Sequence, residues 1–96
     1  MEFKVIIRPT AYLQIIEAVG FVAKVSIEAS QNLYQEIMDA FNSLKEFPYR
    51  FPIDERFNIF KKPEHKIVLG KGRYFALYYV EKDMVIIEQF CDNRKK

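Results

Sequence analysis

The last third of the chain carries three runs of apolar residues that are rich in β-branched and aromatic side chains. Two short breaks separate them, Gly70-Lys71-Gly72 and Glu81-Lys82-Asp83. Runs of this composition are typical of strands, and breaks of about three residues leave room only for hairpins. The pattern therefore predicts an antiparallel meander with strands over 65–70, 73–81 and 84–91.

An alternating pattern also opens the chain. Phe3, Val5 and Ile7 alternate with mostly polar neighbours, which predicts a first strand over 2–8. Pro9 cannot continue a strand ladder, but it fits the first turn of a helix. We therefore expect a helix to begin directly after this strand.

Apolar side chains at intervals of three and four residues follow, and they predict two helices over 10–26 and 29–46. Ser30 is placed to cap the second helix. Gly20 costs the first helix about 1 kcal/mol relative to alanine, so we expect another backbone to approach it closely. Both helices have wider apolar faces than one sheet face requires, so the excess is either core or a surface kept for a partner.

Together these elements predict one α+β domain over 1–96 with the order β-α-α-β-β-β. We expect a twisted, four-stranded antiparallel sheet packed against an αα-hairpin. Residues 48–64 contain three prolines and no clear period. They are expected to form a long loop, and loops of this length are often functional or mobile.

Composition narrows the class of protein. No apolar run approaches the roughly 20 residues that span a bilayer, and the start of the chain does not have the pattern of a signal peptide. A single cysteine, Cys91, excludes an internal disulfide framework and suits a reducing cytoplasm. One cysteine and one histidine argue against a zinc site. Without a glycine-rich phosphate loop or a nucleophile motif, we expect neither metal nor cofactor.

The net charge of +2 conceals an asymmetry between the two parts of the chain. Residues 1–60 carry six Lys or Arg and eight Asp or Glu, whereas residues 61–96 carry nine and five. The basic part is either a solvated face or a surface for a polyanion or an acidic partner. Its candidate target-binding residues are Lys61, Lys62, Lys71 and Lys95.

Catalysis in this chain would depend on Lys, Arg, Glu and Tyr side chains. That set suits general acid–base work on a substrate that brings its own nucleophile. RNA is such a substrate, because its 2′-hydroxyl can attack the adjacent phosphate. His65 is the only imidazole, and we expect it to be structural rather than catalytic.

The order of these segments resembles the RelE/ParE superfamily of bacterial toxins, which belong to type II toxin–antitoxin modules that include plasmid stabilisation systems. The resemblance extends from about Phe3 to Arg94. It rests on Pro9-Thr10-Ala11, Leu44-Lys-Glu-Phe-Pro48, His65-Lys-Ile-Val-Leu, Arg73-Tyr-Phe-Ala-Leu-Tyr-Tyr-Val80, Met84-Val-Ile-Ile and Asp92-Asn-Arg94.

The resemblance implies a cytoplasmic toxin that is silenced by a small antitoxin protein wrapped around it. The RelE-like branch cuts messenger RNA in the ribosomal A site and would make this chain a metal-independent endoribonuclease, an mRNA interferase. The ParE-like branch inhibits DNA gyrase without that chemistry. A third possibility is a non-toxic relative whose basic face docks an acidic protein.

The resemblance also assigns site residues. Lys66 stands at a basic position of the family's second strand, and Arg94 or Lys95 can fill the basic position after the fourth strand. With Arg73 they give the candidate catalytic set, Lys66, Arg73 and Arg94, which would stabilise charge on the phosphate. Val68 and Phe75 stand where the nucleases carry a lysine and the central arginine, which argues for the ParE-like branch. We nevertheless expect the nuclease branch slightly more, because translation inhibitors are common in the superfamily. Arg73, two residues before Phe75, is expected on the same face of the strand and so in part to compensate.

Overall fold

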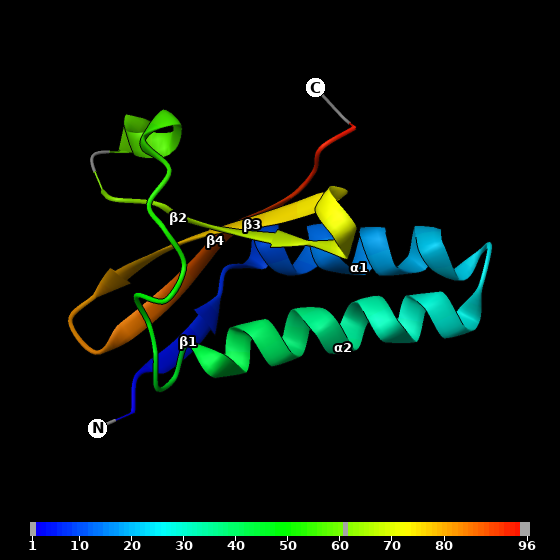
Figure 1. The fold of residues 1–96 in the computed structure, drawn as a ribbon, viewed down its shortest axis with the longest axis horizontal. Coiled ribbons are helices and arrows are strands. Elements are labelled where there is room, and N and C mark those ends of the chain that lie inside the picture. The colour runs from blue at the N-terminus through cyan, green and yellow to red at the C-terminus, as the bar shows by residue number, and fades with distance from the viewer. Residues whose placement is uncertain (1, 61, 95–96) are drawn as a thin grey trace.

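The computed structural model describes residues 2–60 and 62–94, and in it two helices lie side by side along a four-stranded sheet (Figure 1). The α+β class, the two helices and the four strands are confirmed. Two short 3₁₀ segments, η1 and η2, accompany them. The elements in chain order are β1 (Lys4–Ile7), α1 (Pro9–Ala23), α2 (Ile27–Ser43), η1 (Glu55–Phe60), β2 (His65–Leu69), η2 (Gly70–Gly72), β3 (Tyr74–Glu81) and β4 (Met84–Asp92).

The sheet has the strand order β1-β4-β3-β2 and is mixed. The hairpins β2–β3 and β3–β4 are antiparallel, as predicted. β1 pairs with β4 in parallel, with Lys4 opposite Met84 and Ile7 opposite Ile87, so the prediction of a wholly antiparallel sheet is wrong. The reason is topological: α1 and α2 return the chain to the end where β1 began. β2 then runs in the direction of β1, and β4 does so again after two reversals.

The core lies between the helices and one face of the sheet. Alternate strand residues point toward the helices, and the largest fully buried side chains include Tyr78, Ile37 and Ile87. The sheet contributes Ile67, Leu69, Tyr74, Ala76, Tyr78, Val85, Ile87 and Phe90, and the helices and the residue after them contribute Ala11, Ile15, Leu33, Ile37, Phe41 and Leu44. We call the opposite side of the sheet the open face.

The helices differ at their ends from the prediction. Both are shorter than predicted, and the break between them is shifted toward the start of the chain. Ser26 caps α2, because its Oγ accepts a hydrogen bond from the Ala29 N–H at 3.0 Å. Ser30, the predicted cap, lies inside the first turn and donates to the Ile27 carbonyl at 2.6 Å. Outside its own helix backbone, no described atom lies within 4 Å of a Cβ built on Gly20, so no other part of the described chain approaches it closely.

The segment 48–64 is partly ordered rather than a plain loop. Ile53 forms an antiparallel bridge with His65, and the Lys66 N–H donates to the Pro52 carbonyl at 3.0 Å. The ring of Phe57 in η1 packs against that of Phe75 with centroids 5.7 Å apart. The segment therefore extends the outer edge of β2 and reaches the open face of the sheet. Within the described residues, no helix has the length and apolar character needed to cross a bilayer.

Candidate functional site

Arg73 and Arg94 lie together in a hollow between α1 and the ends of β3 and β4. We call it the arginine hollow; its volume is about 450 Å³. The guanidinium groups lie over the same ring, that of Phe21, at 5.2 and 6.0 Å from its centroid. Its lining residues are Gln14, Glu17, Ala18, Phe21, Arg73, Tyr74, Phe90, Cys91, Asp92 and Arg94.

Asp92 holds the two arginines in place. Its carboxylate lies 3.8 Å from Nη2 of Arg73 and 3.7 Å from Nε of Arg94. It also accepts a hydrogen bond from the Arg94 N–H at 2.9 Å. Nε and Nη2 of Arg73 are buried and have no hydrogen-bond partner among the described residues. Because a buried donor without an acceptor is costly, these groups are suited to receive an acceptor from a bound molecule.

Arg73 reaches this hollow because its backbone is not extended. It caps η2 with φ −73° and ψ −33°, and β3 begins only at Tyr74. The alternation of side chains along a strand therefore does not include Arg73. The prediction that Arg73 shares a strand face with Phe75 is wrong, and Arg73 turns toward α1 instead.

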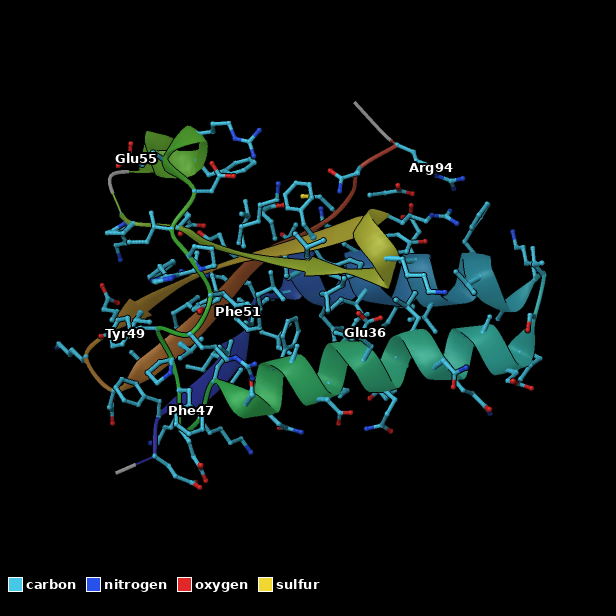
Figure 2. All side chains as sticks on the ribbon, viewed as in Figure 1. Glu36, Phe47, Tyr49, Phe51, Glu55 and Arg94 are labelled. Carbon is cyan, nitrogen blue, oxygen red and sulfur yellow. The ribbon has the colours of Figure 1, made fainter. Side chains whose placement is uncertain are left out.

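Lys66 lies in a second hollow of about 390 Å³, which is formed by β2 and residues 52–56. Its Nζ is 3.9 Å from the Asp54 carboxylate and 4.7 Å from the centroid of the Phe75 ring. The hydrogen bond from Arg56 lowers the pKa of Asp54 to about 2, so this carboxylate stays charged beside Lys66. Glu55 of this hollow and Arg94 of the arginine hollow appear at opposite ends of the sheet in Figure 2.

The structure thus brings two of the three candidate catalytic residues together. Lys66 is not among the residues that line the arginine hollow. Of the candidate target-binding residues, Lys62 is engaged with Glu81 at 2.7 Å and lies over the Tyr79 ring. Lys71 is exposed in η2 with a φ of 56°. Lys61 and Lys95 lie outside the described residues.

The two positions where the nucleases carry further basic residues differ in environment. Val68 is 59% exposed beside Lys66, whereas Phe75 is buried against Phe57. His65 is buried, its Nδ1 lies 2.6 Å from the Phe51 carbonyl oxygen, and its ring stacks on Tyr78. Cys91 lines the arginine hollow, but burial raises the pKa of its thiol, which disfavours the nucleophilic thiolate.

The burial of the Glu64 carboxyl group, and the polar cluster around it, were not predicted from the sequence. Glu64 is fully buried, and neither carboxylate oxygen has a hydrogen-bond partner within the described part of the chain. Burial, aided by the charge of Glu88, raises its pKa to about 7. Glu88 is paired in turn with Arg8 at 3.1 Å, and Arg8 donates to the Tyr79 hydroxyl at 3.1 Å.

Glu88 of this cluster lies at an irregularity in the sheet. The register of β3 and β4 slips between Leu77 and Tyr78, and this bulge leaves Glu88 as the extra residue. A bulge re-aims the side chain that it inserts. The sequence predicts neither the burial of Glu64 nor the bulge at Glu88. Glu64 simply follows a proline and precedes an ordinary strand.

Together the charged groups allow anion binding in the arginine hollow and proton exchange at Glu64. Among the described residues, no group of three or more His, Cys, Asp or Glu side chains is placed to hold a metal ion. The chain matches no protein-family model, and no curated protein sequence matches it.

Proposed function

We propose that this chain is the toxin of a bacterial type II toxin–antitoxin pair and acts in the cytoplasm on translation or on gyrase. The observation that carries the proposal is the arginine hollow at the end of the segment that resembles the toxin superfamily. Two guanidinium groups share one aromatic ring there, and Nε and Nη2 of Arg73 are buried without a hydrogen-bond partner among the described residues. Guanidinium groups bind phosphate and carboxylate groups with directed hydrogen bonds.

The geometry supports inhibition by binding better than RNA cleavage. Cleavage as the resemblance describes it needs Lys66, Arg73 and Arg94 around one phosphate, because transition-state charge must be met by donors already in place. Lys66 lies instead in the second hollow beside the Asp54 carboxylate. We therefore favour the ParE-like branch, in which the basic side of the molecule docks on gyrase.

The antitoxin in this proposal is a small acidic protein that covers the arginine hollow. Charge complementarity supports this partner, since residues 61–96 carry nine Lys or Arg against five Asp or Glu. An acidic side chain or a terminal carboxylate would give Nε and Nη2 of Arg73 the hydrogen-bond acceptor that the described residues do not supply.

Regulated expression in a bacterial host tests the proposal. We expect growth arrest that is reversed by co-expression of the neighbouring open reading frame, with intact transcripts and induced DNA-damage signalling. Primer extension on cellular mRNA is the decisive measurement between the branches. A-site-phased cuts that vanish in a Lys66→Ala/Arg73→Ala double variant would establish the nuclease instead, and unaffected growth would leave only a non-toxic binding module.

A further inference from the structure

The outer surface of α1 is unusually apolar for a helix that faces solvent. Between Pro9 and Ala23 its one charged residue is Glu17, and Glu17 lines the arginine hollow. Tyr12, Leu13 and Ile16 are 54%, 65% and 49% exposed. A helix that is apolar on all sides is normally covered on all sides.

These side chains form one continuous surface, which we call the α1 face. Residues 12, 16, 20 and 23 follow each other at intervals of four, four and three, so they lie along one stripe, with Leu13 beside it. Two further exposed apolar side chains, Val25 and Ile27 (86% and 64% exposed), follow in the turn and at the start of α2. The exposed apolar area is on the order of 500 Å², near the upper end for a monomeric protein.

Gly20 supplies an independent observation. Glycine inside a helix costs about 1 kcal/mol relative to alanine, and the fold itself gives no reason for it. A Cβ at this position would meet no described atom within 4 Å, and no positive φ is involved. If close approach explains Gly20, the approaching backbone belongs to another molecule.

The α1 face is complementary to itself. Its first half carries the large side chains Tyr12, Leu13 and Ile16, and its second half carries the small residues Gly20 and Ala23. A two-fold axis that sets two α1 helices antiparallel would place Ile16 of each copy over Gly20 of the other. Such an interface uses the same patch twice, as closed dimers do.

We propose that the α1 face is the interface of a symmetric homodimer with antiparallel α1 helices. Stable dimers bury roughly 800 Å² per subunit, and the α1 face supplies more than half of this before its polar rim is counted. An acidic partner is a poorer occupant, because Glu28, Glu36 and Asp39 of α2 make the helical layer acidic. The dimer leaves the arginine hollow free and does not depend on the function proposed above.

Sedimentation velocity across a range from low micromolar to submillimolar concentration tests the dimer. We expect the unmodified chain to shift from monomer to dimer over this range. Gly20→Leu fills the space for the second backbone, and Ile16→Asp places a charge in the interface. Each should weaken the dimer by at least about tenfold, as expected for a residue at the centre of an interface. Matched controls are Asn32→Leu on α2 and Val68→Asp on the open face, both at exposed positions, which should dimerise normally.

Exchanging the large and the small residue of the α1 face distinguishes specific packing from non-specific hydrophobic association. The double variant Ile16→Ala/Gly20→Ile exchanges the large and the small position and should restore much of the dimer that Gly20→Ile alone loses. Both positions are exposed, so circular dichroism should show folded variants throughout. A monomer at every concentration, or a dimer that Gly20→Leu and Ile16→Asp leave intact, would overturn the proposal; the first result would leave the α1 face to a different protein.

Discussion

At the scale of single residues, Glu64 is a buried carboxyl group whose charge is not compensated by a hydrogen bond among the described residues. Its carboxyl group is removed from water and accepts no hydrogen bond among the described residues. It also faces the charge of Glu88, with Lys62 as the opposing cation. Burial of an unpaired charge is so costly that such a group binds a proton instead. Glu64 is therefore expected to ionise near neutral pH.

This property predicts a pH-dependent stability. The pKa of Glu64 is raised from 4.5 to about 7 in the folded state, so the folded chain binds the proton more tightly than the unfolded chain. Its contribution is full below pH 4.5 and is lost as the pH rises through 7. We expect Glu64→Gln to remove a fall of about 2 kcal/mol in the free energy of unfolding between mildly acidic and mildly alkaline pH.

Urea denaturation at both ends of this pH range measures the effect. The exposed Glu55→Gln provides a matched control that should keep the slope of the unmodified chain. Equal slopes for Glu64→Gln and the unmodified chain would show that Glu64 titrates normally.

The turn between β2 and β3 offers a second prediction for single residues. Gly70 and Gly72 have φ values of +61° and +93°, where a side chain is strained. A Cβ on Gly70 would also lie 2.9 Å from Cδ2 of Tyr74, whereas on Gly72 it meets no described atom within 4 Å. Alanine at either site should destabilise the fold by about 1 kcal/mol or more, and Gly70→Ala should cost more. Thermal unfolding of the two variants checks the order, and an equal loss would contradict the contact with Tyr74.

At the scale of elements, two serines near the start of α2 have different roles, and only Ser26 caps the helix. Ser26 accepts the hydrogen bond of a helix cap, so Ser26→Ala should cost about 1 kcal/mol. Ser26→Asp keeps an acceptor at the cap position and should retain most of the stability. Chemical denaturation measures both changes, and an Ser26→Asp variant as unstable as Ser26→Ala would argue against the cap.

The sequence predicted the type of each element well and the assembly of the sheet only in part. Apolar runs with short breaks determine the meander, because a hairpin forces its two strands to run in opposite directions. Nothing local constrains the partner or direction of β1, which depends on the path through the helical pair. The cap was misplaced by four residues for a related reason: Ser26 and Ser30 are equivalent cap candidates until the end of α1 is known.

At the scale of the whole molecule, the sequence predicted some residues of the candidate site but not the contacts between them. The charge asymmetry and the resemblance pointed to Arg73 and Arg94 without their common ring, Phe21, which comes from a distant part of the chain. Lys66 was grouped with them because it is basic, but its partner Asp54 belongs to a segment with no periodic pattern. Glu64 lies at the end of that same segment, and its neighbour Glu88 lies at a bulge in β4. None of these contacts follows from spacing along the sequence.

Arg73 and Arg94 lie in one hollow and Lys66 lies in another, and this separation predicts which substitutions depend on each other. Arg73 and Arg94 share Asp92 and Phe21, so each substitution changes the environment of the other. A single-stranded RNA oligonucleotide serves as a polyanion probe, and fluorescence anisotropy measures its affinity. Arg73→Ala and Arg94→Ala should each lower this affinity about three- to tenfold. The loss should be smaller at high salt, where electrostatic contacts contribute less. A double-mutant cycle should show coupling between these two arginines, whereas Arg73→Ala and Lys66→Ala should combine additively, as separated sites do. Strong coupling between Arg73 and Lys66 would mean that all three cations meet on one phosphate in the bound state. The nuclease branch would then be preferred over the ParE-like branch.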